Sequence, residues 1–185
     1  MKQYTTISDA TPLVAFVKKG ELNILKEIFG EIFLPKAVYE ELTRDTKRNQ
    51  EQSNIIKYNV NQNWLKIYDL KQKTLPNLNL GAGEFEAINS CFELKNPLLL
   101  MDEKKGRRIA KSNKIPVIGT IGILISALNK ELKTKTELLK NLDQLLENDF
   151  YISSRVIAKF YNKIQKNWKQ KCGFGFSSQR LFIRN

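Results

Sequence analysis

The apolar residues of this chain fall into two kinds of segment, short runs and longer stripes with helical spacing. The short runs are bounded by turn residues and have the length of β-strands. They cover residues 4–8, 31–35, 64–70, 97–102 and 116–119. The run over 97–102 is apolar up to its final Asp, which is typical of a strand inside a parallel sheet.

Helices are expected wherever apolar residues recur three or four positions apart. The expected helices cover residues 11–20, 21–30, 36–43, about 82–93, 103–113, 122–130, 136–146 and 154–165. Residues 44–63 are polar and weakly patterned, which indicates a long loop or a polar helical extension. Strands that alternate with helices of this length predict an α/β fold, with a mainly parallel central sheet covered on both faces.

The composition of the 185 residues, with 42% hydrophobic and 27% charged, suits one globular domain with a sizeable core. No apolar run approaches the roughly 18 residues of a membrane span, so we expect no membrane partner. The first residues lack the apolar segment of a signal peptide, and two cysteines are too few for a disulfide framework. These features together predict a cytoplasmic protein.

The chain contains no histidine, which excludes His-based acid–base chemistry and makes a zinc site improbable. Any catalysis must therefore depend on carboxylates, hydroxyls, lysines or a hard metal ion. The net charge is +12, and it is unevenly distributed, because residues 150–185 contain basic side chains and no acid. This asymmetry is typical of a protein with a polyanionic or acidic partner, although a lysine-rich composition can also serve solubility alone.

Two acids stand where strands end. Asp9 follows the first strand, and Asp102 ends the strand over 97–102. Ligands of an open parallel sheet bind outside the carboxyl ends of the strands. The structural alternative for both acids is helix capping. Thr11 and Pro12 are expected to start the first helix themselves, which leaves Asp9 without that role, whereas Asp102 remains a fair candidate for an N-cap.

Helix geometry separates Glu41 from its neighbour. Glu40 lies four residues from both Lys36 and Arg44, an arrangement typical of a surface row of ion pairs. Glu41 points about 100° away, at the border of the apolar face, where a carboxylate is costly unless it has a partner.

The same geometry separates Glu84 from Glu86. Glu84 shares its stripe with Ile88 and Cys91 and is expected to face inward, whereas Glu86 is expected to face outward. A Glu in the first turn also complements the helix dipole, so Glu84 has a structural alternative as well.

These observations predict that Asp9, Glu41, Glu84 and Asp102 converge on one side of the sheet. Four like charges in one pocket raise one another's pKa unless a cation neutralises them. Carboxylate oxygens favour Mg²⁺ or Mn²⁺, which can activate water for phosphoryl transfer. Together with the basic surplus, the cluster indicates metal-dependent hydrolysis of phosphodiester bonds.

The chain resembles the PIN-domain family, and within it the prokaryotic branch close to ribonuclease toxins of VapC type. The resemblance rests on "ISDATPLVAFVKKGELNILKEIFGEIFLPKAVYEEL", "LGAGEFEAI", "LLLMDEKKGRRIA" and "VIGTIGIL", in this order. The characteristic acids of the family would fall on the same four positions, Asp9, Glu41, Glu84 and Asp102. Thr11 and Thr120 match positions where the family often has a hydroxyl group near these acids.

The resemblance implies a three-layer α/β/α sandwich over residues 1–165, which hydrolyses RNA with Mg²⁺ or Mn²⁺. It also implies a homodimer and, in toxin–antitoxin pairs, inhibition by a small antitoxin protein. The residues expected to contact RNA are Lys104, Lys105, Arg107, Lys169 and Lys171. In two respects the chain departs from the family pattern, because Gly81 stands where some relatives have an Asp, and a basic tail over 166–185 extends beyond the usual end.

Three alternative functions compete with this one. The glycines of "LGAGEFEA" invite a dinucleotide site, but Glu84 would repel a pyrophosphate. A haloacid-dehalogenase-type phosphatase needs a second Asp where this chain has Thr11. The serious alternative is a PIN-like module that binds RNA or protein without cleavage. For the tail, nucleic-acid contact remains open beside a disordered end or an interface segment.

Overall fold

The computed structural model describes residues 4–44, 49–147 and 150–171, and within this part it describes the segment 166–171 by its backbone alone. The tail beyond Lys171, and with it most of the predicted segment 166–185, lies outside the described residues. The described chain divides into two compact units, Met1–Tyr151 and Ile152–Asn185. The sheet belongs to the first unit. The predicted boundary between residues 165 and 166 stays a prediction.

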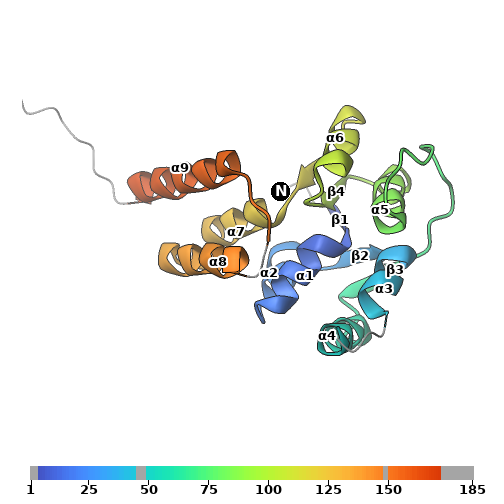
Figure 1. Cartoon of the computed structure of the whole chain (residues 1–185), viewed down its shortest axis with the longest axis horizontal. Coiled ribbons are helices and arrows are strands. Elements are labelled where there is room, and N and C mark those ends of the chain that lie inside the picture. The colour runs from blue at the N-terminus through green and yellow to red at the C-terminus, as the bar shows by residue number, and fades with distance from the viewer. Residues whose placement is uncertain (1–3, 45–48, 148–149, 172–185) are drawn as a thin grey trace, which may run out of the picture. The chain divides into compact units, whose positions relative to one another are not determined.

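The first unit is built around a sheet of five parallel strands (Figure 1). The strands are β1 (Thr5–Ser8), β2 (Ile32–Pro35), β3 (Leu65–Tyr68), β4 (Pro97–Leu100) and β5 (Val117–Ile118), in the order β3-β2-β1-β4-β5. Each one coincides with a strand expected from the sequence. The α/β class and the sandwich of a parallel sheet between helices are therefore confirmed.

Helices connect the strands of the first unit and flank its sheet. They are α1 (Ala10–Lys18), α2 (Asn23–Phe29), α3 (Lys36–Thr43), α4 (Gln50–Asn61), α5 (Ala82–Glu93), α6 (Lys104–Ser112), α7 (Thr120–Asn129) and α8 (Lys135–Glu147). The second unit contains α9 (Ser154–Lys171). The polar stretch that the pattern left open contains α4, which turns Ser53 and Ile56 inward. Since the apolar side of α4 is narrow, its periodicity is hard to recognise in the sequence. Within the described residues, no helix is both long and apolar enough to cross a membrane.

The strand order creates a switch point between β1 and β4. From β1 the chain moves outward to β2 and β3, and it then returns to the other side of β1 to add β4 and β5. Ser8 is paired with Leu100, and the amide N–H of Asp9 donates to the carbonyl of Leu100 at 2.9 Å. The carboxyl ends of β1 and β4 therefore lie side by side, where open α/β sheets bind their ligands.

An apolar cluster holds the elements under this edge together. Ile7 of β1, Leu99 of β4, Ile88 of α5 and Ile109 of α6 are buried in one contiguous group. Because interiors of this kind are packed like crystals of small molecules, the cluster fixes the relative positions of these four elements.

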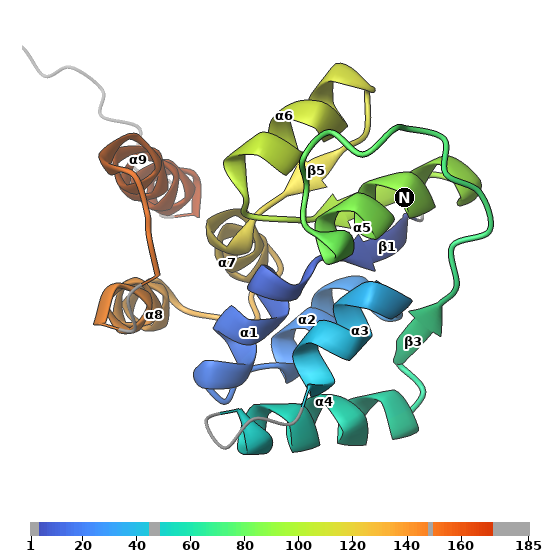
Figure 2. The same cartoon turned by 45° about the vertical axis from the view of Figure 1, so that its right-hand side comes forward.

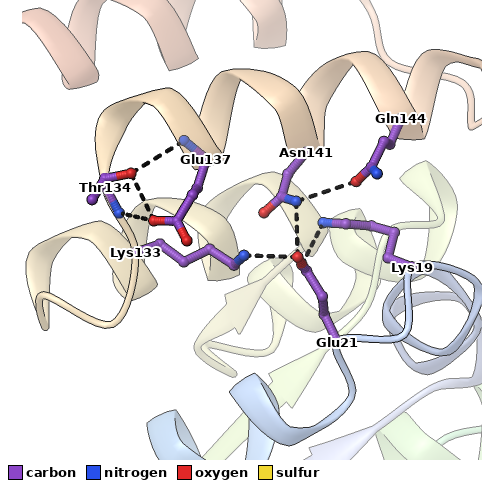
Figure 3. A network of polar contacts seen from close by, with 7 residues as sticks. All are labelled: Lys19, Glu21, Lys133, Thr134, Glu137, Asn141 and Gln144. Atoms are coloured by element: carbon purple, nitrogen blue, oxygen red, sulfur yellow. Dashed lines mark hydrogen bonds and ion pairs between the residues drawn. The ribbon is translucent and has the colours of Figure 1, made fainter.

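A polar network fastens α8 to the turn between α1 and α2 (Figure 3). Glu21 in that turn accepts hydrogen bonds from Lys133 at 2.7 Å and from Asn141 at 3.1 Å. Lys19 forms an ion pair with the same carboxylate at 3.2 Å, and the side chains of Lys19 and Lys133 are only 2% and 8% exposed. Charges this well buried are stable only when paired, so the network fixes the position of α8 within the first unit.

Candidate metal-binding and catalytic site

Asp9 lies at the junction of β1 and α1. The helix begins at Ala10, so Asp9 occupies the N-cap position, and the prediction that Thr11 caps this helix is wrong. The side chain of Asp9 nevertheless makes no capping hydrogen bond. Pro12 is the third residue of the helix and has no N–H to donate to a cap. The position of Asp9 is thus that of a cap, but its carboxylate remains available for another role.

The carboxylate of Asp9 is buried among other acids. Its residue is only 4% exposed, and burial raises the pKa of Asp9 from 3.8 to about 7. The charges of Glu84, Glu41 and Asp102 act in the same direction, while the backbone N–H of Ala10 acts against it. The four predicted acids are therefore close enough to interact electrostatically around Asp9.

Two of these acids, Asp9 and Glu41, lie close to Gly83 of α5. A Cβ atom at this position would lie 3.1 Å from Oε2 of Glu41 and 3.7 Å from Oδ1 of Asp9. The two carboxylates therefore face the same bare stretch of α5. Glu41 is exposed, and it lines a small cavity of about 160 Å³ together with Ala10 and Thr11. In the described part of the chain, no hydrogen bond joins Thr11 to any of the four acids.

Glu84 makes a contact at the start of its own helix, which is the structural alternative that the sequence left open for it. It is half-buried, and its Oε2 accepts a hydrogen bond from the N–H of Gly81 at 3.1 Å, which helps to cap α5. Burial raises the pKa of Glu84, as do the charges of Glu103 and Glu41, although the bond from Gly81 opposes this shift. The Glu84 carboxylate therefore makes a capping hydrogen bond and also lies near the negative charges of Glu103 and Glu41.

Glu86 does not face solvent as predicted. It is half-buried, and its Oε2 accepts a hydrogen bond at 2.9 Å from the N–H of Ala37, in the first turn of α3. A carboxylate is favourable there because the N-terminal end of a helix carries a partial positive charge. Helical spacing within α5 cannot reveal this contact, since α3 comes from a distant part of the sequence.

Asp102 is held by the beginning of α7. Its Oδ1 accepts from the N–H of Thr120 at 2.9 Å, and its Oδ2 accepts from the hydroxyl of Thr120 at 2.6 Å. Burial raises the pKa of Asp102, and the bonds from Thr120 and the charge of Arg107 oppose this shift without cancelling it. The competing role of Asp102 as N-cap of α6 is excluded, because Glu103 occupies that position and accepts from Gly106.

Arg107 lies beside Asp102. Its Nη1 donates to the carbonyl of Met101 at 2.6 Å. A Cβ atom at Gly119 would lie 2.5 Å from Oδ1 of Asp102 and 2.8 Å from Nη1 of Arg107. Only a glycine therefore leaves room for the carboxylate and the guanidinium at this point.

The other basic residues expected to contact RNA differ in their surroundings. Lys105 is half-buried and donates to the carbonyl of Asn79 at 2.9 Å, whereas Lys104 is exposed. Lys169 and Lys171 belong to the end of α9, where side chains lie outside the described residues. The prediction did not include Arg108 and Lys111, which are exposed on α6 and share one side of that helix with Lys104.

The acids suit a hard cation chemically, but they are not arranged around one. Among the described residues, no group of three or more His, Cys, Asp or Glu side chains is positioned to hold a metal ion. The oxygens of Asp102 and Glu84 accept hydrogen bonds from Thr120 and Gly81 instead. All donors are nevertheless carboxylate oxygens, and each oxygen can accept more than one bond.

The burial of Asp9 beside three other acids is the observation that favours a cation, because a positive ion would remove the cost of ionising it. Sequence reasoning missed Glu103, whose charge acts on Glu84. Its position directly after Asp102 was the available signal.

A known protein family matches most of the chain. The profile of a family described as a PIN domain matches residues 5–166, which is most of the chain and includes all four acids. No curated protein matches the chain.

Proposed function

Because the chain belongs to the PIN-domain family, whose members are generally nucleases that use divalent metal ions, we propose that it is a Mg²⁺- or Mn²⁺-dependent endoribonuclease. The substrate would be RNA, and the reaction would be hydrolysis of its phosphodiester bonds. The observation that carries this proposal is the buried carboxylate of Asp9, whose pKa is raised to about 7 by burial and by Glu84, Glu41 and Asp102. A carboxylate in such a place is costly to ionise unless a cation neutralises its charge, and otherwise it retains a proton.

In this proposal, Asp9, Glu41, Glu84 and Asp102 would hold the metal. A divalent cation supplies a polarised water and neutralises charge that develops on the phosphate. The protein supplies the orientation of the acids. Thr120 fixes both oxygens of Asp102 through its N–H and its hydroxyl, and the bare backbone at Gly83 leaves space between Asp9 and Glu41.

The RNA would be attracted by the positive charge of the protein and by α6 in particular. Lys104, Arg108 and Lys111 are exposed on one side of this helix, which follows Asp102 directly. Lys105 and Arg107 are nearer to the acids, where the charge of Lys105 acts on Glu84 and that of Arg107 on Asp102. We include all five as RNA-contacting residues, because phosphate contacts dominate the affinity of nucleic-acid binding.

The resemblance to VapC-type toxins also suggests a role for the protein in the cell. We propose that the protein acts in the cytoplasm as a homodimer, and that it is the toxin of a pair whose small antitoxin inhibits it. Co-expression with the product of a neighbouring reading frame is the experiment that tests this role, since an antitoxin would suppress the RNA cleavage of the purified complex.

Cleavage of single-stranded RNA by the purified protein, with Mn²⁺, with Mg²⁺ or with chelator, tests the chemistry. We expect cleavage only with a metal ion, together with a rise in melting temperature when Mn²⁺ is added. Asp9→Asn should abolish cleavage and remove most of the Mn²⁺-induced rise in melting temperature while leaving the protein folded.

The adjacent glutamates of α3 provide a matched control, because both are exposed but only Glu41 faces Gly83. Glu41→Gln should reduce cleavage strongly, and Glu40→Gln should leave it unchanged. If RNA is bound but never cleaved, with no effect of metal ions, the protein is the non-cleaving RNA-binding module instead.

A further inference from the structure

A second and larger cavity is lined by none of the four acids. It has a volume of about 450 Å³, within the range of small-ligand sites. The cavity is formed between the loop that follows β3 and the first half of α5. It is lined by Lys73, Thr74, Leu75, Pro76, Asn77, Ala82, Phe85 and Glu86. None of these residues has been given a role in metal binding.

The loop that covers this cavity is fastened to α5. It arches from β3 back to the first residues of that helix (Figure 2). Glu93 accepts hydrogen bonds from the hydroxyl of Tyr68 at 2.6 Å and from the N–H of Lys71 at 3.0 Å. The N–H of Leu75 donates to Oδ1 of Asn89 at 2.8 Å. Because these bonds hold the loop in place, the cavity is preformed and a ligand need not order the loop on binding.

The lining combines an aromatic ring with a positive charge. The ammonium group of Lys73 lies 5.9 Å from the centre of the Phe85 ring, and Lys73 itself is exposed. Aromatic rings bind nucleobases by stacking, and basic side chains bind the attached phosphates. A nucleotide is a ligand of suitable size that uses both groups.

A third group in the lining could recognise the base. Glu86 borders the cavity, and the hydrogen bond from Ala37 uses its Oε2. A carboxylate has a second oxygen that can accept from an amino group, as it does with the exocyclic amino group of cytosine. Adenine and cytosine carry such a group, whereas uracil has none.

The cavity is also close to the acids along two helices. Phe85 directly follows Glu84 in α5. Ala37, which Glu86 holds, lies one turn or about 6 Å before Glu41 on α3. The acids and the cavity thus share α3 and α5, so an RNA strand bound at the acids could extend to the cavity.

We propose that the cavity between the loop and α5 is a nucleobase subsite for the RNA strand. In it, Phe85 stacks on an unpaired base beside the cleavage position, Lys73 contacts the phosphate of that nucleotide, and Glu86 accepts from its amino group. This inference rests on the proposed function, since it concerns the same substrate.

The test is the binding of fluorescein-labelled short oligomers of adenylate, cytidylate or uridylate to the full-length protein, by fluorescence anisotropy in chelator to prevent cleavage. Phe85→Leu keeps an apolar side chain but loses the aromatic ring, and it should weaken binding of the adenylate and cytidylate oligomers about tenfold. Phe85→Tyr keeps the ring and should bind like the wild type. Equal melting temperatures of the two variants verify that the fold is intact.

Charge is tested separately from stacking. Lys73→Gln should reduce the slope of log affinity against log salt concentration by about 0.7, the value for one phosphate contact on a single strand. Lys140→Gln, which removes an exposed charge from α8, should leave the slope unchanged. Glu86→Gln should lower the ratio of the affinity for adenylate and cytidylate oligomers to the affinity for uridylate oligomers.

The outcomes separate this inference from the proposed function. Cleavage in Mn²⁺ by the wild type, together with equal RNA affinity of the wild type, Phe85→Leu and Lys73→Gln, overturns the subsite alone. That result would also be expected if the cavity received a polypeptide partner. A wild type that neither binds nor cleaves any RNA overturns the proposed function and the subsite with it.

Discussion

Asp9 illustrates how one carboxylate can have the position of a structural residue without its contacts. It stands where a helix cap is normally found, yet its side chain makes no capping hydrogen bond, and Pro12 at the third helical position has no N–H to offer. Its burial beside three other acids disfavours ionisation. At the residue scale, the free-energy cost of ionising Asp9 can be measured, because it makes the stability of the fold depend on pH.

The first prediction concerns the pH dependence of stability without metal. Burial raises the pKa of Asp9 from 3.8 to about 7, so between these values the folded protein binds more protons than the unfolded chain. The free energy of unfolding should therefore fall as pH rises from about 4 to about 7 and then stop changing for this group. Urea unfolding in chelator at several pH values measures this fall.

Asp9→Asn removes the ionisable group, so the variant should show a smaller fall and should exceed the wild type in stability at about pH 8. Equal pH dependence in both proteins would contradict the raised pKa.

The second prediction concerns Gly119, which leaves room for Asp102 and Arg107. Gly119→Ala should force these side chains apart, reduce RNA cleavage strongly and lower the free energy of unfolding by about 1–3 kcal/mol. Cleavage rates and urea unfolding provide the measurements.

Gly81→Ala is the matched control. Both glycines are helix N-caps with negative φ, but a Cβ atom at Gly81 would meet nothing closer than 3.8 Å. Similar losses in the two variants would indicate an effect of capping instead of crowding at Asp102.

At the scale of elements, the long loop between β3 and α5 depends on a few hydrogen bonds to α5. Glu93 accepts from the side chain of Tyr68 and from the backbone of Lys71 and Gln72. These bonds join the loop to the helix that carries Glu84. The loop has no secondary structure of its own, so its order depends on such contacts.

The third prediction is that Glu93→Ala releases this loop. Trypsin should cut the folded variant after Lys71 and Lys73 much faster than the wild type. A loop without these hydrogen bonds unfolds locally more often and then enters the protease active site. The free energy of unfolding should fall by only about 0.5–1.5 kcal/mol, since the exposed N–H groups of Lys71 and Gln72 can bond to water once Glu93 is gone.

Glu31→Ala removes only an exposed ion pair with Lys66, and it should change neither the cutting rate nor the stability appreciably. Unchanged proteolysis of the Glu93 variant would show that other contacts hold the loop.

At the scale of the whole molecule, positive charge is concentrated toward the end of the sequence. The eight basic side chains after residue 149 have no acidic counterpart there. In the described part of α9, Arg155, Lys159 and Lys163 recur every four residues and are all exposed. Such a row resembles the electrostatic surface of a nucleic-acid-binding protein.

The fourth prediction is that the row on α9 contributes to RNA affinity without sequence preference. Replacing Arg155, Lys159 and Lys163 by Gln should weaken binding of all RNA oligomers and reduce the salt slope by up to about 2, at about 0.7 for each phosphate contact. Anisotropy titrations at several salt concentrations measure both quantities. An unchanged slope would favour an interface with another protein chain instead.

Much of the fold was readable from the sequence. Five short runs became five parallel strands. The run over 97–102 is the clearest of them, because a strand buried inside a parallel sheet is apolar along its length. The strand-end positions of Asp9 and Asp102 were readable as well, since parallel strands present their carboxyl ends at one edge. The cap of α1 was misjudged by two residues, because a threonine before a proline is itself a common start of a helix.

Contacts between distant segments were decided only by the tertiary structure. The sequence assigned Glu86 to the surface, but α3 brings the N–H of Ala37 to its carboxylate. It left Asp102 as a candidate cap for α6, but Thr120 at the start of α7 binds both of its oxygens. The sequence by itself thus determined the order of elements and the residue types at the sheet edge, because these follow from local periodicity. The partner of each side chain depends on how helices far apart in the chain pack together, which no local pattern encodes.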